Sequence, residues 1–375
     1  MTTRTSTKVM PGWPGSCENL TRLVEGYVAR EAVSGAMVEV IHLDGGSYSF
    51  ARSGPGLGYH LEPGISFRWF CVIKVALAYT VLHLLTSRGM GPETPACEFL
   101  PELRGERESI TVAHLLTHCS GLPSFPVGGN AASLSAAALT TRLEPGVRPG
   151  ERTDYNICTA WTLVALIIER LSGRDIADAL DRLMFAPLGL TDSVLTARPG
   201  DERLLTRVAR LKTSLPGPRQ IEALTSPSVL RRLPPWIGGL GTLTDMVRFF
   251  AYLLSVRGGE TEPAGGAAET AAVMALTTGG RAAYDEGLGR MVAYAQGIMT
   301  DVSKGGFGAG WSPESFGVGG AVNGKMVMAV WAEPRLRVAC GVALPAVGRL
   351  SSALLQRIGA CLRADLEAAT VLRAA

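Results

Sequence analysis

Short runs of apolar and β-branched residues near both ends of the chain predict strands, and helical spacing of apolar residues dominates between them. The glycine-containing tripeptide Asp44-Gly45-Gly46 is typical of a hairpin turn between two such runs. A second pair of runs is joined across Glu333-Pro334. The predicted strands are residues 37–43, 47–51, 325–331 and 337–344.

Apolar residues three and four positions apart predict amphipathic helices. Thr242 or Thr244 is available to cap the helix that follows it. The Ala/Gly/Glu/Thr-rich stretch 258–280 is expected to be a surface excursion. The predicted helices are residues 20–28, 75–85, 110 to about 121, 159–171, 176–184, 245–254 and 354–366.

The strand signal vanishes between residue 91 and about residue 226 and returns afterwards. A chain of 375 residues also exceeds the usual size of a single core. We therefore predict an α/β sheet domain made of residues 1–90 and 227–375, with a helical lobe, residues 91–226, inserted into it. A cleft between these two parts is the expected ligand site.

Cys71 and Lys74 stand three residues apart where the helix over residues 75–85 begins. Residues at this spacing share one helix face, and the first turn of a helix favours a thiolate through its free N–H groups and dipole. A lysine nearby can stabilise the thiolate or, when neutral, accept the thiol proton. A Cys-x-x-Lys pair also arises by chance, and a buried cysteine next to an exposed lysine is the alternative.

The net charge of +3 and the absence of a Lys/Arg block argue against a nucleic-acid partner. We find neither a signal-peptide pattern nor an apolar run long enough to cross a membrane, so a cytoplasmic location is expected. The seven cysteines have no metal-like spacing and are expected to be reduced. His114 and His118 lie four apart on one predicted helix without a suitable third ligand, so we predict no metal and no cofactor. Adjacent helix residues point apart, which argues against a dyad of His118 and Cys119.

The order of these elements resembles the serine β-lactamase and penicillin-binding-protein superfamily, and its class C and esterase-like branch most of all. Cys71-Val72-Ile73-Lys74 stands where that family has Ser-x-x-Lys, and residues 110–123 are similar to the signature that follows it. Pro149-Gly150-Glu151 precedes Tyr155, while Pro187-Leu188-Gly189-Leu190 and Gly238-Gly239-Leu240 follow in the expected order. The resemblance implies an antiparallel sheet flanked by N- and C-terminal helices, with an inserted helical lobe.

Three motif positions depart from the family pattern. The serine is Cys71, the asparagine two residues after the tyrosine is Ile157 with Asn156 beside it, and the third motif is Val318-Gly319-Gly320 instead of Lys/His-x-Gly. The missing cation argues against a β-lactamase or peptidase that binds its substrate's carboxylate there. Because Ile157 and Val318 replace polar groups, the cleft is expected to favour an uncharged or acyl-like substrate.

The resemblance implies that Cys71, Lys74 and Tyr155 are the catalytic residues and that the amides of Cys71 and Ala321 form the oxyanion hole. We list Asn156, Ile157, Trp236, Val318, Gly319 and Gly320 as candidate substrate contacts, although packing is the simpler role for Trp236. Transacylases and thioesterases of natural-product pathways on this fold keep the nucleophile, lysine and tyrosine while relaxing the third motif.

We therefore expect an acyltransferase whose acyl-enzyme is a thioester on Cys71, with a small-molecule acyl donor, including carrier-bound or coenzyme A thioesters, and an amine or alcohol acceptor. Amines attack thioesters readily and water attacks them slowly, which favours transfer over hydrolysis. Two alternatives stay open. One is a binding protein that has lost catalysis, and the other is an esterase or amidase that uses water as acceptor.

Overall fold

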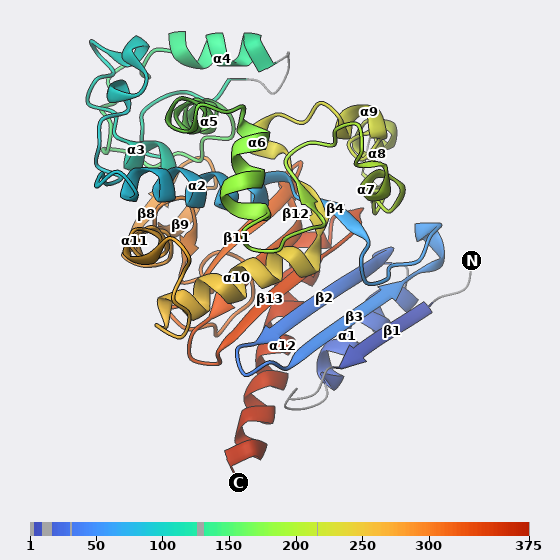
Figure 1. Cartoon of the computed structure of the whole chain (residues 1–375). Helices are drawn as coiled ribbons and strands as arrows, with labels where there is room; N and C mark the ends of the chain where they lie inside the picture. Colours follow the sequence, from blue (N-terminus) through green and yellow to red (C-terminus); the bar gives the residue numbers. More distant parts are fainter. Residues whose placement is uncertain (1–3, 10–16, 31, 126–130, 216, 375) are drawn as a thin grey trace.

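A computed structural model of the chain describes residues 4–9, 17–30, 32–125, 131–215 and 217–374. Its centre is an antiparallel sheet with the strand order β1-β3-β2-β13-β12-β11-β10-β9-β8 (Figure 1). The strands are β1 (Arg4–Val9), β2 (Gly35–His42), β3 (Ser47–Ser53), β8 (Arg281–Asp285), β9 (Arg290–Tyr294), β10 (Met299–Thr300), β11 (Phe316–Val322), β12 (Lys325–Glu333) and β13 (Val338–Ala343).

Helices cover both faces of this sheet and form a separate layer above one end of it (Figure 1). Two small sheets complete the fold, β4 (Ser66–Arg68) with β7 (Leu240–Thr242) and β5 (Ser193–Val194), and β6 (Lys212–Thr213) with β14 (Ala346–Val347). The helices are α1 (Glu18–Ala29), α2 (Lys74–Thr86), α3 (Val112–Leu116), α4 (Ala131–Thr140), α5 (Thr159–Ser172), α6 (Ile176–Leu180), α7 (Glu202–Thr206), α8 (Pro218–Ala223), α9 (Pro227–Leu230), α10 (Leu243–Arg257), α11 (Gly266–Thr277) and α12 (Ser351–Ala374).

Alternation along the central strands divides the core into two layers, because successive side chains of a strand point to opposite faces. Trp331 of β12 packs with Leu20 of α1 and Ile358 of α12, whereas its neighbour Val330 packs with helices α2 and α10 on the other face. On that face Gly341 of β13 permits the close approach of α10, since a Cβ there would lie 2.5 Å from Val247.

The predicted strands and most predicted helices are confirmed within a few residues. Thr242 caps α10 by accepting a hydrogen bond from the Asp245 amide at 3.1 Å, and His42 and Gly46 close the predicted hairpin. All seven cysteines are free thiols. None of the helices in the described ranges combines the length and the apolar character needed to span a bilayer.

Three expectations about secondary structure were wrong. The stretch 258–280 contains helix α11, which packs against α2; its alanines are strong helix formers but leave little amphipathic pattern. The region 91–226 includes the short strands β5 and β6, each of only two residues. The helix predicted from residue 110 to about residue 121 ends at Leu116, whereas the helix predicted over residues 176–184 is present, as α6 followed by a π-helical turn over Asp181–Phe185.

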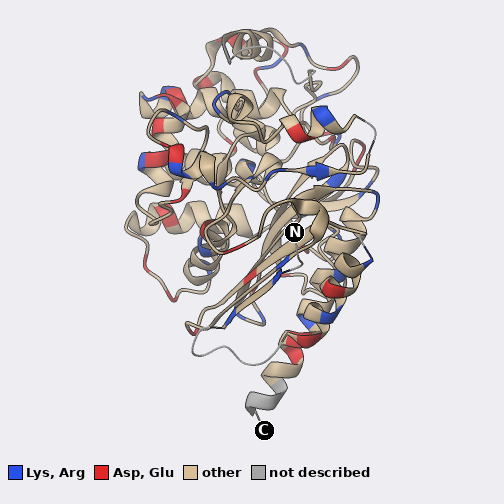
Figure 2. Ribbon diagram, turned by 90° about the vertical axis from the view of Figure 1, so that its right-hand side faces the viewer, with Lys and Arg blue, Asp and Glu red and all other residues tan. Residues whose placement is uncertain are grey.

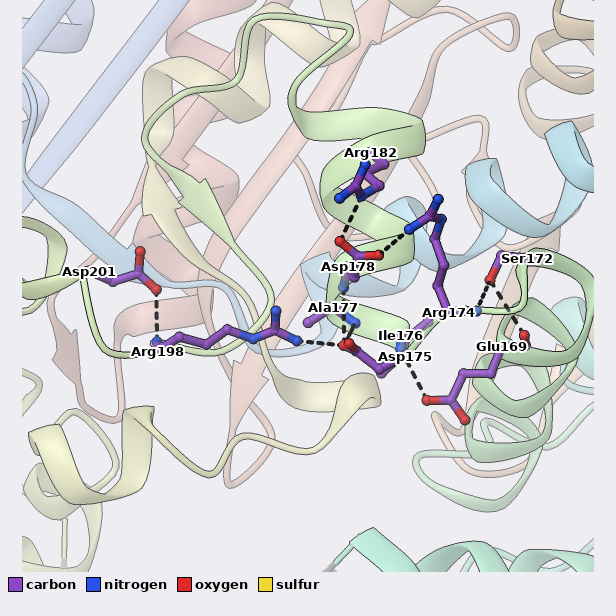
Figure 3. Close-up of polar contacts among 10 residues, drawn as sticks. All are labelled: Glu169, Ser172, Arg174, Asp175, Ile176, Ala177, Asp178, Arg182, Arg198 and Asp201. Carbon is purple, nitrogen blue, oxygen red and sulfur yellow. Dashed lines mark hydrogen bonds and ion pairs between the residues drawn. The ribbon is translucent and has the colours of Figure 1, made fainter.

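Helix α6 begins at a dense polar network (Figure 3). Asp175 accepts hydrogen bonds from the amides of Ala177 and Asp178 at 3.1 Å and pairs with Arg198. Acidic and basic residues are similarly mixed along the outer helices and are not gathered by sign (Figure 2), in agreement with the small net charge.

Candidate active site

Cys71 lies in a 3₁₀ turn, Phe70–Ile73, that connects β4 to α2. Phe70, directly before it, has a φ of 52°, a left-handed conformation that is uncommon for a bulky residue and is often found at functional sites. The turn is held by hydrogen bonds from the Trp69 amide to the Gly239 carbonyl and from the Val72 amide to the Trp69 carbonyl. Cys71 itself is half-buried.

Lys74 is the first residue of α2, and its side chain is buried. Its Nζ donates a hydrogen bond to the Trp236 carbonyl at 2.9 Å and lies near the Cys71 side chain. Burial lowers the pKa of Lys74, and the neighbouring sulfurs of Cys71 and Cys158 only partly oppose this effect. The amine can therefore be neutral at a pH where an exposed lysine is charged, which suits a proton acceptor. The expected pairing with Cys71 is present, although Cys71 lies in the 3₁₀ turn and not in α2 itself.

Tyr155 comes from the loop before α5 and meets both residues. Its ring centre lies 5.6 Å from Lys74 Nζ, and its side chain lies beside Cys71, with which it lines the same cavity. Burial raises the pKa of Tyr155 well above its usual value, and the neighbouring Cys71 adds to this effect. The phenol is therefore protonated at neutral pH and is able to donate a proton.

A buried polar network that we did not predict holds the backbone and the ring of Tyr155 in place. Asp285, at the end of β8, accepts hydrogen bonds from the Tyr155 amide at 3.1 Å, the Leu288 amide at 2.9 Å and the Tyr294 hydroxyl at 3.1 Å. The His118 ring packs 4.5 Å from that of Tyr155. Burial and the nearby Lys74 lower the pKa of His118 to about 3, so the imidazole is neutral. The role of Asp285 could not be predicted from the sequence, because a single aspartate at the end of an exposed strand belongs to no recognisable motif.

The histidine pair expected on one helix is not arranged that way. Helix α3 ends at Leu116, and His118 follows with a φ of 58°. The His114 Nδ1 accepts a hydrogen bond from the Thr111 amide and caps α3, while the His118 Nδ1 accepts one from the Asn156 amide. In the part of the chain that the structure describes, no group of three potential ligands is placed to hold a metal ion.

Cys71 and Tyr155 open onto a cavity of about 300 Å³, at the small end of the range for ligand sites. The candidate oxyanion residue Ala321 also lines it, at a register shift between β11 and β12. The remaining lining residues are Leu288, Arg290, Met299, Gly305, Phe307, Gly319, Gly324, Met326, Ser352 and Gln356.

Among the candidate substrate contacts, Gly319 lines this cavity, whereas Val318 and Gly320 point to the other face of β11. Val318 joins the apolar core, and Gly320 lies against the nucleophile turn, where an added Cβ would meet the Trp69 carbonyl oxygen at 2.7 Å. These two residues therefore do not supply the cavity wall that we expected.

Asn156, Ile157 and Trp236 are also not among the residues that line the Cys71 cavity. The Asn156 side chain is buried and has a structural role. It donates a hydrogen bond to the Leu122 carbonyl at 2.7 Å and accepts one from the Ala160 amide at 3.1 Å. Trp236 faces a different cavity of about 590 Å³ and reaches the site only through its carbonyl, which binds Lys74.

Solved structures with the same fold are similar to the whole chain. A penicillin-binding-protein homologue from Caulobacter crescentus covers 96% of this chain and is itself covered in full, with a TM-score of 0.74 and 18% identity. EstA from Arthrobacter nitroguajacolicus Rue61a covers 97% of this chain and is covered to 99%, with a TM-score of 0.73 and 19% identity. At these identities the likeness shows the fold.

Curated relatives match shorter stretches. Esterase EstB from Burkholderia gladioli is 28% identical over 148 residues, 34% of this chain and 37% of that protein. Monacolin J acid methylbutanoyltransferase from Aspergillus terreus is 30% identical over 116 residues, 28% of each protein. The match thus spans little more than a third of these relatives at most. The model of the protein family described as "Beta-lactamase", however, matches residues 20–344 of this chain. This chain therefore belongs to the beta-lactamase family.

Proposed function

We propose that this protein is an enzyme that transfers an acyl group through a thioester on Cys71. The observation that carries the proposal is the proximity of a thiol, a buried amine and a buried phenol, of which the thiol and the phenol line the 300 Å³ cavity. A protein that had lost catalysis would have no need to keep Lys74 and Tyr155 in contact with a half-exposed thiol.

In the first step Lys74, as a neutral amine, accepts the proton of the Cys71 thiol, and the sulfur attacks the acyl carbon of the donor. The Sγ–C bond forms while the bond from the acyl carbon to the leaving alcohol or thiol breaks. The leaving group takes a proton from the Tyr155 phenol, and Lys74 returns its proton to Tyr155. We assign the oxyanion hole to the backbone amides of Cys71 and Ala321, because both residues line the cavity; such a donor contributes about 10²–10³ in rate.

In the second step an amine or alcohol acceptor attacks the thioester carbonyl, loses its proton to the same residues and restores the thiol. A thioester reacts faster with amines than with water, which favours transfer. Support for an acyltransferase also comes from the similarity to monacolin J acid methylbutanoyltransferase. Similarity to esterase EstB favours hydrolysis as the second candidate, with water as the acceptor.

Intact-protein mass spectrometry after exposure to a panel of acyl thioesters and activated esters tests this proposal. We expect a mass gain of one acyl group in the wild type and none in Cys71→Ala. Cys361→Ala is the matched control, since Cys361 is also a partly buried free thiol but lies on α12 and does not line the cavity. An adduct that persists in Cys71→Ala, or no adduct with any donor, would contradict the proposal.

Product analysis with and without amine and alcohol acceptors then separates the two candidates. A transferase gives the acylated acceptor in excess over the free acid, whereas a hydrolase gives the free acid under both conditions. Cys71→Ser provides a further comparison, because an oxygen ester loses the thioester's preference for amines. If Cys71→Ser hydrolyses faster without losing transfer, the role given to the thioester is wrong.

A further inference from the structure

The Cys71 cavity holds one fixed positive charge. Arg290, the first residue of β9, lines it, and the other described residues of the wall are apolar, glycine or neutral polar side chains with no carboxylate among them. Arginine keeps its charge at neutral pH. A charged group in a small, mostly apolar cavity is costly unless something compensates it.

No carboxylate of the described residues is paired with this guanidinium, since the oxygens of Asp285, its cross-strand neighbour on β8, accept hydrogen bonds from other groups. Arg290 forms no ion pair within the described ranges, and its Nη2 donates one hydrogen bond, to the neutral Gly305 carbonyl at 3.1 Å. Arg152, by contrast, forms ion pairs with Glu144 and Glu286. The remaining donors of Arg290 are thus available to a ligand.

A second donor lies beside the guanidinium. A Cβ on Gly306 would meet the Arg290 Nη1 at 3.0 Å and the Gln356 Nε2 at 3.4 Å, so the ends of these two side chains, from β9 and α12, lie close to each other beside Gly306. Gln356 also lines the cavity. A neighbouring guanidinium and amide N–H₂ that line one cavity can both donate hydrogen bonds to the oxygens of a carboxylate or phosphate.

We propose that Arg290, assisted by Gln356, binds an anionic group of the acyl donor, either a carboxylate on the acyl chain or a phosphate on the carrier thiol. This inference rests on the acyl transfer proposed above and names its substrate class. It keeps the acyl-like part of the expected uncharged or acyl-like substrate and adds a charge to it, since that expectation depended on Val318 and Ile157, two residues outside the cavity wall.

Three donors with the same reactive thioester distinguish the two sources of the anion. Butyryl-N-acetylcysteamine is neutral, glutaryl-N-acetylcysteamine carries a carboxylate on the acyl group, and butyryl-phosphopantetheine carries a phosphate on the leaving thiol. Each step forms the Cys71 Sγ–acyl bond and releases the carrier as a protonated thiol. We expect one anionic donor to acylate Cys71 at least tenfold faster than the neutral donor.

Arg290→Met is expected to remove this preference, because the rate with the anionic donor falls at least tenfold relative to the rate with the neutral donor, while Arg290→Lys retains part of it. Arg281→Met is the matched control, since Arg281 is exposed on the neighbouring strand β8 and does not line the cavity. Equal loss with neutral and anionic donors, or a preference that survives Arg290→Met, would overturn the inference.

A readout that needs no acyl transfer keeps the inference apart from the proposed function. Iodoacetate and iodoacetamide alkylate the same thiol and differ in charge, and peptide mass spectrometry measures each rate at Cys71 alone. We expect the ratio of iodoacetate to iodoacetamide rates to fall at least fivefold in Arg290→Met and to stay unchanged in Arg281→Met. An unchanged ratio in Arg290→Met refutes the anion site, even if Cys71 proves to be acylated. A reduced ratio without any acylation supports the anion site and refutes the transferase.

Discussion

Burial acts in opposite directions on the two residues that flank Cys71. It lowers the pKa of Lys74, because the charged form of a lysine is the ammonium, and it raises the pKa of Tyr155, because the charged form of a tyrosine is the phenolate. Both groups are therefore neutral over a common pH range. This separates their roles, with Lys74 as the proton acceptor and Tyr155 as the proton donor.

The pH dependence of acylation follows from these shifts. The rate should rise as Lys74 loses its proton, at a pH below the ordinary lysine value of 10.5, and Tyr155 should cause no alkaline loss up to pH 10. Lys74→Met should lower the acylation rate at neutral pH by about 10²–10⁴-fold and abolish this rise. The measurement is the rate of Cys71 adduct formation between pH 5 and 10, with the exposed Lys304→Met as control. A wild-type profile shared by Lys74→Met would show that another group accepts the proton.

The two faces of strand β11 have different neighbours, the Cys71 cavity on one side and the turn that carries Cys71 on the other. Gly319 faces the cavity, where an added Cβ would meet the flexible end of Met326 at 2.8 Å. Gly320 faces the nucleophile turn, where the obstacle is the Trp69 backbone. Backbone cannot move aside as a methionine end can, so the two adjacent glycines are under different constraints.

Gly320→Ala should therefore lower the free energy of unfolding by about 1–3 kcal/mol and slow acylation, because the turn that carries Cys71 must shift. Gly319→Ala, the matched control, should cost less stability, because Met326 can turn away, while it narrows the cavity. Denaturant unfolding and the rate of Cys71 adduct formation measure both effects. If Gly319→Ala proves the more destabilising change, this account of β11 is wrong.

Strand β11 could not be predicted from the sequence, unlike its neighbour β12 in the sheet. Strands β2, β3, β12 and β13 were predicted because apolar, aromatic or β-branched residues recur along them, whereas β11, with three glycines in seven residues, has a low strand propensity. Its identity comes from pairing with β12, which is a tertiary effect. Cys71, Lys74 and Tyr155 were found through motifs with fixed spacing. Asp285 and Arg290 could not be found in that way, since only the hairpin of β8 and β9 brings them to the site.

On the scale of the whole molecule, helices from the two ends of the chain form one layer on the sheet (Figure 1). Asp365 of α12 joins them, since its Oδ1 accepts a hydrogen bond from the Asn19 Nδ2 at 2.6 Å and its Oδ2 accepts one from the Leu20 amide at 3.0 Å. The carboxylate thus caps the start of α1 from another helix. The division at residues 91 and 227 stays a prediction, and one apolar core includes residues from both sides of it.

Helix α12 contributes to the cavity through Gln356 and to the packing of α1 through Asp365. A substitution at Asp365 should affect only the packing. Gln356 lines the cavity, whereas Asp365 lies about 13 Å further along the helix. Asp365→Ala leaves the Leu20 amide without its buried partner and should lower the free energy of unfolding by about 1–3 kcal/mol. Glu367→Ala, which breaks an ion pair with Arg363 on the same helix, should cost less than about 1 kcal/mol. Denaturant unfolding tests the stability, and alkylation of Cys71 by iodoacetamide tests the site. A change in that rate upon Asp365→Ala would show that the layer of terminal helices controls the cavity as well as the fold, because the contact at Asp365 would then be coupled to Gln356 through the helix.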